Sequence, residues 1–366
     1  MTYEGARSIT GPYLGLLGAS AAVVGVVAGL GELLGYSLRL VSGYLSDRTR
    51  QYWGFTFVGY AVNLLAVPLL ALAGRWEVAA ALIVAERIGK AIRTPARDAM
   101  LSHATSRIGR GWGFGVHEAL DQIGAILGPM VVAAVLYLGG GYRLSFAALL
   151  VPALFALTVL TVARNLNPRP QALEISAGAM QPGGLARAFW LYLIAMAFVA
   201  AGVADFPLIA FHFGKAGVVP EVWIPIFYAV AMGVDALAAL GLGRVYDRLG
   251  LKVLLIVVVL SALAVPMVFL GRFHGALFGV ALWGASIGAQ ESIMRAAVAG
   301  MVSRDKRGTA YGIFNTGFGI AWFLGSALLG ILYDVSLPSM VAFSVVTQLL
   351  SIPLLVAVIR MSPASQ

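Results

Sequence analysis

The chain has 366 residues, of which 60% are hydrophobic and 11% are charged, and its formal net charge is +9. Soluble domains carry about 25% charged residues, so a fold of this composition cannot hide its apolar surface from water, and lipid is the expected solvent. The absence of cysteine excludes disulfides, thiolate metal sites and cysteine nucleophiles. The four histidines have no metal-ligand spacing, so the sequence predicts neither a metal nor a cofactor.

Apolar runs of membrane-spanning length follow one another along the whole chain. A transmembrane helix needs about 20 such residues. By that criterion the sequence predicts eleven spans, at 20–43, 54–74, 77–98, 113–138, 143–163, 187–213, 221–243, 252–270, 274–300, 309–333 and 338–359. A shorter segment, 3–17, precedes them and is interrupted by Glu4 and Arg7. Counted with this segment, the chain is expected to be an all-α integral membrane protein of twelve transmembrane helices.

A charged motif near the end of an apolar span occurs once in each half of the chain. The segment Gly43-Tyr-Leu-Ser-Asp47-Arg48 recurs in pattern as Gly243-Arg-Val-Tyr-Asp247-Arg248, and the offset is 243 − 43 = 200 residues. A second pair of similar segments, 107–115 and 304–312, is separated by 304 − 107 = 197 residues. Two motifs at nearly equal offsets indicate a duplicated bundle of six plus six helices.

The same offset predicts a shortened first helix. It aligns Met1 with Ala201, inside the span 187–213, so the second half has 200 − 187 + 1 = 14 residues of that helix with no counterpart in the first half. We therefore expect the first helix to be truncated at its N-terminus, as a misassigned start codon would cause.

The basic residues predict the topology. Four of them lie near one set of span ends, namely Arg75, Arg143, Lys215 and Arg272, and fourteen lie near the other set. Because positive charge favours the cytoplasmic side, both termini are expected in the cytoplasm, in a multi-pass protein of the cell (inner or plasma) membrane. This placement also argues against a nucleic-acid partner. The predicted organisation is an N-terminal bundle at 1–163, a polar cytoplasmic linker at 164–186 and a C-terminal bundle at 187–366.

The repeated motif resembles the signature loop of the major facilitator superfamily, Gly-x-Leu-x-Asp-Arg-x-Gly followed by basic residues. Gly43, Leu45, Asp47 and Arg48 match it, whereas Arg50 stands where the family usually has glycine. The second copy keeps the matching residues Gly243, Asp247, Arg248, Gly250 and Lys252. The resemblance covers the whole chain and implies two six-helix bundles working by alternating access, with the Asp and Arg residues as gate contacts. The alternative is a solvated turn with ordinary positive-inside arginines.

A glycine pattern in the span 113–138 bears on the direction of transport. Gly115, Gly124 and the pair Gly128-Pro129 resemble the fifth-helix pattern of the superfamily's proton-coupled drug and metabolite antiporters. That pattern continues with a glycine where this chain has Val132. Glycines on one helix face allow close backbone approach, and Pro129 is expected to bend the helix. The alternative is a general small-residue packing face.

Ionisable residues inside apolar spans are costly and indicate function. In the span 77–98, Glu86, Lys90, Arg93 and Arg97 step by 4, 3 and 4, so they form one stripe, and Arg87 lies beside it. Arg87 occupies the place of the fourth-helix arginine of proton-coupled family members. We expect Glu86 with Arg87 to take part in coupling, and Pro95 to break or kink the helix.

Other spans supply further candidates for proton coupling or substrate binding. Glu118 and Asp121 share a face of their helix. Two carboxylates in a low dielectric cannot both ionise cheaply, so one of them is expected to carry a proton. The alternative is that one of them forms a permanent ion pair with an arginine of the fourth helix. Glu4 with Arg7, and Glu291 with Arg295, have the spacing of intrahelical pairs. The remaining candidates are Glu32 and Arg39, which share a stripe, and Asp205 and Asp235, which have no partner nearby in sequence.

The sequence thus predicts a monomeric secondary transporter of a small organic solute in the lipid bilayer, coupled to protons and working by efflux (antiport). The alternative within the class is a proton-coupled symporter for metabolite uptake. A non-transporting sensor or a membrane enzyme is a remote alternative, because no ATP-binding segment, zinc spacing or serine elbow is evident.

Overall fold

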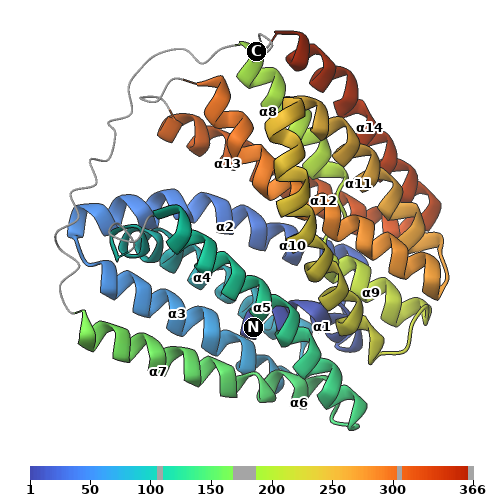
Figure 1. Ribbon diagram of the computed structural model, residues 1–366. Helices are drawn as coiled ribbons and strands as arrows, with labels where there is room; N and C mark the ends of the chain where they lie inside the picture. Colours follow the sequence, from blue (N-terminus) through green and yellow to red (C-terminus); the bar gives the residue numbers. More distant parts are fainter. Residues whose placement is uncertain (105–109, 168–186, 303–306, 362–366) are drawn as a thin grey trace. The chain divides into compact units, whose positions relative to one another are not determined.

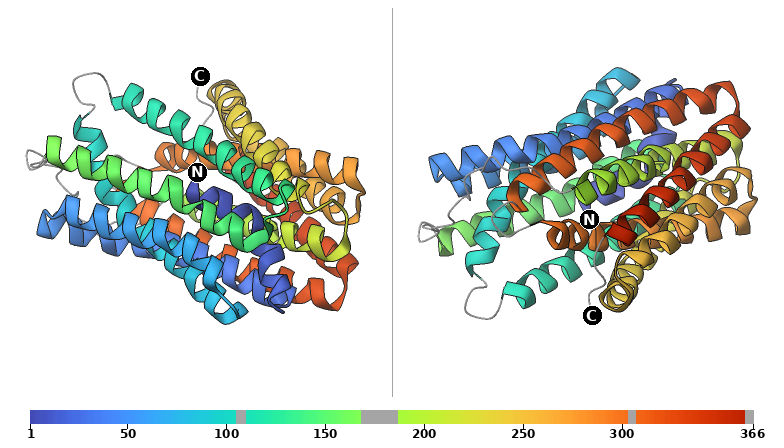
Figure 2. Two further views of the ribbon diagram at one scale, coloured as in Figure 1. Left: turned by 90° about the horizontal axis from the view of Figure 1, so that it is seen from below. Right: turned by 90° about the horizontal axis from the view of Figure 1, so that it is seen from above.

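The protein is helical in every element that the computed structural model describes, which covers residues 1–104, 110–167, 187–302 and 307–361. This part of the chain contains fourteen α-helices and two short 3-10 turns (Figure 1, Figure 2). An apolar chain in lipid must satisfy its backbone N–H and C=O groups internally, and an α-helix does this within one segment. The expected all-α class is therefore confirmed.

The described helices group into twelve segments, as expected. Ten of these segments contain a single α-helix, and a short 3-10 turn follows α3 and another precedes α11. The ten helices are α1 (Thr2–Leu16), α2 (Ala21–Thr49), α3 (Tyr52–Leu69), α4 (Trp76–Ala104), α5 (Arg110–Tyr137), α10 (Trp223–Leu249), α11 (Val253–Leu270), α12 (Phe273–Met301), α13 (Arg307–Val335) and α14 (Leu337–Met361). The other two segments are each made of two helices: α6 (Gly141–Ala148) with α7 (Leu150–Leu166), and α8 (Arg187–Gly202) with α9 (Phe206–Ala216).

Nine of the twelve segments in the described part are long and apolar enough to cross a membrane by themselves. The other three are α1, α4 and α12. α1 has 15 residues, whereas α8 and α9 together extend from Arg187 to Ala216. The predicted truncation of the first helix stays a prediction.

α4 carries the predicted stripe of charges, and such a helix needs partners for these charges within the protein.

The chain divides into two compact units, each described here by itself. Unit 1 comprises Met1–Ala19, Leu30–Ala177 and Glu221–Ala229, and unit 2 comprises Ser20–Gly29, Gly178–Pro220 and Val230–Gln366. In unit 1, α3 packs along α4 and α1 packs on α5. In unit 2, α11 packs on α12, and α8 packs on α13 and α14. The predicted limits of the bundles and linker stay a prediction, and residues 168–186 of that linker lie outside the described part.

The span expected at 187–213 lies within the candidate membrane span Arg187–Ala216, but the structure interrupts its helix. α8 ends at Gly202 and α9 begins at Phe206. Pro207 lacks a backbone N–H and cannot continue the ladder of α8. The carbonyl oxygens freed at the break are satisfied from unit 2: Gly202 O accepts from Ser344 Oγ (2.5 Å) and Gln348 Nε2 (3.1 Å), and Ala204 O accepts from Trp283 Nε1 (2.9 Å).

The expected break at Pro95 does not occur, since α4 is one helix from Trp76 to Ala104. A proline at this position removes the hydrogen bond to the carbonyl oxygen of Ala91. Ser42 of α2 donates its Oγ hydrogen bond to that oxygen at 2.9 Å. A side chain from a neighbouring helix therefore replaces the lost backbone bond, and the helix continues.

Glycine pairs set how closely the helices of unit 1 approach. A Cβ atom at Gly89 of α4 would lie 2.4 Å from the backbone N of Asn63, and one at Gly59 of α3 would lie 2.7 Å from Gly89 O. These distances leave no room for a side chain, so α3 and α4 pack with their backbones in contact. The close packing places Asn63 directly beside the charged face of α4.

Candidate functional site

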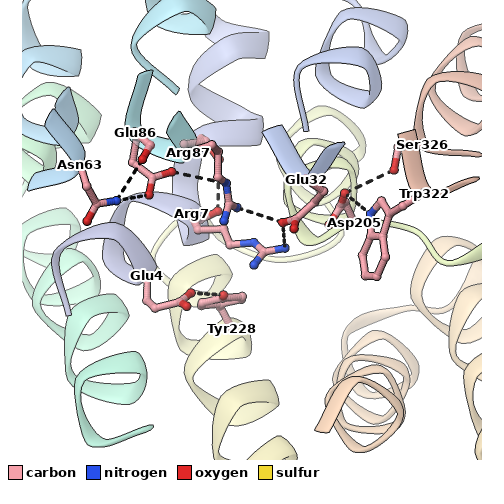
Figure 3. Close-up of polar contacts among 11 residues, drawn as sticks. Glu4, Arg7, Glu32, Asn63, Glu86, Arg87, Asp205, Tyr228, Trp322 and Ser326 are labelled. Atoms are coloured by element: carbon pink, nitrogen blue, oxygen red, sulfur yellow. Dashed lines mark hydrogen bonds and ion pairs between the residues drawn. The ribbon is translucent and has the colours of Figure 1, made fainter. Parts of the chain in front are cut away.

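Three helices of unit 1 bring ionisable side chains together around Glu32 (Figure 3). Glu32 Oε1 on α2 lies 3.4 Å from Nη2 of Arg7 on α1 and 3.4 Å from Nη2 of Arg87 on α4. The side chain of Arg87 is only 11% exposed. Gly31 permits the approach, since a Cβ there would lie 2.9 Å from Cγ of Arg87. Two guanidinium groups around one carboxylate offset much of the cost of burying these charges.

Arg87 also binds a second carboxylate. Its Nε lies 3.4 Å from Oε2 of Glu86, and Asn63 Nδ2 donates to Oε1 of the same carboxylate at 2.5 Å. The predicted pair of Glu86 and Arg87 thus lies in the same network as Glu32. One guanidinium group joins carboxylates from α2 and α4, so a proton taken up by either carboxylate would change the contacts of the other.

Glu4 on α1 extends the network along the helix. The hydroxyl of Tyr228, in the part of α10 that belongs to unit 1, donates to Glu4 Oε2, and both side chains are buried. Arg7 lies three residues after Glu4 on the same face, and its Nη2 also lies 3.4 Å from Oε1 of Glu32. Glu4 and Arg7 thus both belong to a set of contacts between helices.

Unit 2 has its own buried carboxylate, Asp205, in the break between α8 and α9. Asp205 is 2% exposed, and its Oδ2 accepts from Trp322 Nε1 at 2.8 Å and from Ser326 Oγ at 3.3 Å (Figure 3). It stands at the N-cap position of α9 but makes no side-chain cap bond to that helix. Its carboxylate joins the broken segment to α13 instead.

The first copy of the repeated motif lies within a helix rather than in a turn. α2 continues through Asp47 and Arg48 to Thr49. Asp47 Oδ1 accepts from the hydroxyl of Tyr52 at 3.1 Å, and Arg48 donates to the hydroxyl of Tyr44 at 3.2 Å. The chain turns at the following residues, between α2 and α3, and the role of Asp47 and Arg48 as gate contacts stays a prediction. Gly43 packs on α4, where a Cβ would be 3.5 Å from Cβ of Pro95.

The last position of the signature, where the family has glycine, has the same backbone conformation in both copies. Arg50 has φ +54°, and Gly250, 250 − 50 = 200 residues later, has φ +60°. Left-handed backbone is free for glycine and costly for a residue with a Cβ. This left-handed conformation explains why the family pattern has glycine here. In the first copy of the motif, Arg50 adopts the same conformation.

Replacing Arg50 with glycine is expected to stabilise the protein by up to about 1 kcal/mol, because it removes the left-handed penalty. Thermal unfolding of the purified protein measures this. Arg50→Ala is the matched control: it removes the same charge, keeps a Cβ and should give no gain. Gly250→Ala should destabilise. Equal stabilisation by Arg50→Gly and Arg50→Ala would assign the effect to charge and contradict the backbone explanation.

The glycine pattern of α5 packs on α1. A Cβ at Gly128 would lie 2.8 Å from the backbone N of Gly5, which explains why this face carries glycine. Gly115 and Gly124 lie in the same helix, and α5 continues through Pro129 without interruption. Val132, where the antiporter pattern has glycine, is fully buried.

The remaining predicted candidates that the structure describes lie on α2, α5 and α10. Arg39 lies over the ring of Tyr36, at 5.6 Å from its centroid. Asp235 is buried on α10, and a Cβ at Gly288 of α12 would lie 2.5 Å from its Oδ1. Asp121 is exposed on α5. Gly243 lies in α10 and Arg248 is exposed near its end. The side chains of Glu118, Asp247, Glu291 and Arg295 lie outside the described part of the structure.

Several residues of both networks were not expected from the sequence, namely Asn63, Tyr228, Trp322 and Ser326. Asn63 carried a usable signal, because it is a lone amide in the apolar run of α3. The others are tyrosine, tryptophan and serine, which membrane helices also use at interfaces and in packing, so composition did not distinguish them.

The twelve helical segments of the described part, with ion pairs buried between helices, are typical of one class of protein, the multi-pass α-helical transporter. The family model described as Major Facilitator Superfamily matches residues 2–326 and 228–366. The chain belongs to this superfamily, as its motifs indicated. It is a membrane transporter rather than an enzyme.

The chain is similar to proteins from three organisms. It is 44% identical over 365 residues to uncharacterized proteins of Mycobacterium tuberculosis and Mycobacterium bovis, with coverage of 98% of this chain and 89% of each relative. An uncharacterized MFS-type transporter of Methanocaldococcus jannaschii is 25% identical over 334 residues, covering 87% and 82% of the two chains.

Solved structures support the fold. The nucleoside transporter NupG matches with a TM-score of 0.74 and 16% identity over 98% of this chain and 95% of that one. A bacterial homologue of the lysosomal transporter Spinster, in an inward-facing and occupied conformation, matches with a TM-score of 0.71 and 16% identity over 99% and 95%. At this identity the likeness concerns the fold alone.

Proposed function

We propose that the protein exports a small organic solute in exchange for protons by alternating access. The observation that carries the proposal is the network in which Arg87 joins the carboxylates of Glu32 and Glu86, on two different helices. Protonation of one carboxylate weakens its hold on Arg87 and leaves that guanidinium group to the other. Proton binding would thereby change how α2 and α4 hold together, which is the coupling that an alternating-access transporter needs.

The direction of exchange is proposed from α5. Its Gly124 and Gly128 follow the antiporter pattern, and Gly128 gives α5 a close packing face on α1. Val132 favours a second candidate, proton-coupled uptake by symport, because this buried residue departs from the same pattern. The excess of basic residues at one set of helix ends supports cytoplasmic termini and a plasma-membrane location. We further propose that the working unit is a monomer.

A pH gradient across proteoliposomes distinguishes the two candidates. Ethidium, uridine, uridine 5′-monophosphate and glycerol 3-phosphate serve as solute probes. A gradient of one pH unit supplies about 1.4 kcal/mol per exchanged proton, enough for about tenfold accumulation. Antiport predicts that an acidic lumen drives accumulation of the transported probe inside. An alkaline lumen driving it instead would establish symport, and equal movement under both gradients would contradict proton coupling.

Amide variants test the network in the same assay. Glu32→Gln and Glu86→Gln are each expected to keep the exchange of labelled for unlabelled probe but lose accumulation driven by the pH gradient, since the amide cannot take up the proton. Glu77→Gln is the matched control, because Glu77 also lies on α4 but is 46% exposed and pairs with Arg75. Unchanged accumulation in both network variants would remove these carboxylates from the coupling mechanism.

A further inference from the structure

Three cations of unit 1 contact tyrosine rings instead of carboxylates. Nζ of Lys90 lies 4.0 Å from the centroid of the Tyr3 ring, and Cζ of Arg93 lies 4.3 Å from that of Tyr60. Cζ of Arg39 lies 5.6 Å from the centroid of the Tyr36 ring on the same helix. Within the described residues, none of the three cations forms an ion pair of 4 Å or less. Aromatic faces therefore help to hold these charges, and Glu4 and Glu86 add an electrostatic attraction to Lys90.

The two arginines among these cations also lack a described hydrogen-bond acceptor at Nε. Arg93 is 5% exposed, and its Nε is buried without an acceptor in the described part of the chain. The Nε of Arg39 is also buried without an acceptor in the described part. A buried guanidinium group ordinarily has an anion or several acceptors around it, because an unpaired charge is expensive to remove from water. A missing anion would satisfy this requirement.

The carboxylates in this part of unit 1 are already engaged. Glu32 lies between Arg7 and Arg87, Glu86 is held by Arg87, and Glu4 accepts from Tyr228. Among the described residues of α5, Asp121 is an exposed carboxylate that acts electrostatically on Tyr3. Its charge opposes the arrival of an anion beside Lys90.

We propose that Lys90 and Arg93 form a binding site for a carboxylate or phosphate group, and that the transported solute is therefore an organic anion. The two residues are three apart on α4, so their side chains leave neighbouring positions on one face of the helix. Arginine can bind the two oxygens of such a group together, and lysine adds a mobile point charge. This inference rests on the proposed transport function, since the anion would be its solute.

Matched solutes that differ only in charge test the site by binding, with no membrane and no pH gradient. Purified protein in the uncharged detergent dodecyl maltoside is titrated with uridine 5′-monophosphate against uridine, and with glycerol 3-phosphate against glycerol, while its melting temperature is followed. At least one phosphate should raise the melting temperature and its neutral counterpart should not. Lys90→Gln with Arg93→Gln should weaken that binding about tenfold or more, as removal of charged hydrogen bonds does.

Three further variants separate binding from folding. Lys90→Arg keeps the charge and should retain the effect of the anion. Arg75→Gln removes a cation that is 77% exposed and should change nothing. Asp121→Asn removes the opposing charge and should strengthen anion binding. Size-exclusion chromatography of each variant shows whether it is folded before the titration.

A lipid headgroup could supply the same chemistry, so a second arm adds phosphatidylglycerol or phosphatidylcholine in mixed micelles. Stabilisation by phosphatidylglycerol alone, lost in the double variant, would keep the anion site and assign it to lipid. Equal effects of charged and neutral probes, no anion-specific shift in either arm, or a shift that survives the double substitution would each overturn the proposal. Because no gradient is present, these results do not depend on whether transport is coupled to protons.

Discussion

Replacing Arg87 with methionine is expected to destabilise unit 1 by about 3–5 kcal/mol, the range seen when one partner of a buried ion pair is removed. Arg87 lies 3.4 Å from carboxylate oxygens of both Glu32 and Glu86, and its side chain is 11% exposed. Methionine fills much of the same volume, so the effect comes from charge rather than from a cavity. Thermal unfolding in detergent, followed by tryptophan fluorescence, measures it.

The loss should depend on pH and on the partner. At pH 5 the uncompensated carboxylates take up protons more readily than at pH 8, so Arg87→Met should be less harmful in acid. Adding Glu86→Gln to Arg87→Met should recover part of the stability, because it removes a charge that has lost its ion pair with Arg87, whereas Glu32 keeps its contact with Arg7. Arg75→Met is the control for a surface cation. A loss that is equal at both pH values and unaffected by Glu86→Gln would show that Arg87 contributes by packing.

Replacing Asp205 with alanine is expected to destabilise unit 2 by about 3 kcal/mol, because it leaves two buried donors without their acceptor. These donors are Trp322 Nε1, at 2.8 Å, and Ser326 Oγ, at 3.3 Å. Asp205→Asn keeps an oxygen at the same place and should cost less. Hydrogen exchange measured by mass spectrometry should show faster exchange at 203–210 in the alanine variant, because the contact joins the helix break to α13.

A double-mutant cycle identifies the interaction. Asp205→Ala and Trp322→Phe should be less harmful together than the sum of the two, since both remove the same hydrogen bond. Trp190→Phe is the matched control, because Trp190 lies on α8 in the same unit but is 45% exposed. Additive losses for Asp205→Ala and Trp322→Phe would contradict a shared contact and place the stability of the break in the bonds to Gly202 and Ala204.

The departures from the expected helices have local physical causes. The break after Gly202 was signalled by Asp205-Phe-Pro207, since aspartate and then proline often begin a helix. Pro95 looked like the same kind of signal, yet α4 continues through it, and Ser42 donates to the freed carbonyl of Ala91. Side chains of neighbouring helices bind the freed carbonyl oxygens in both places, and the sequence around each proline does not contain that information.

The sequence by itself determined the membrane class, the helical segments and the duplication of the motif. These features follow from the length of apolar runs and from residue spacing, which act within a segment. Only the tertiary structure decided which charges meet. Glu32 binds Arg7, 32 − 7 = 25 residues away, and Glu4 binds Tyr228, 228 − 4 = 224 residues away. Such contacts depend on how glycine faces let neighbouring helices approach, and a shift of a few ångströms between helices would pair the same residues differently.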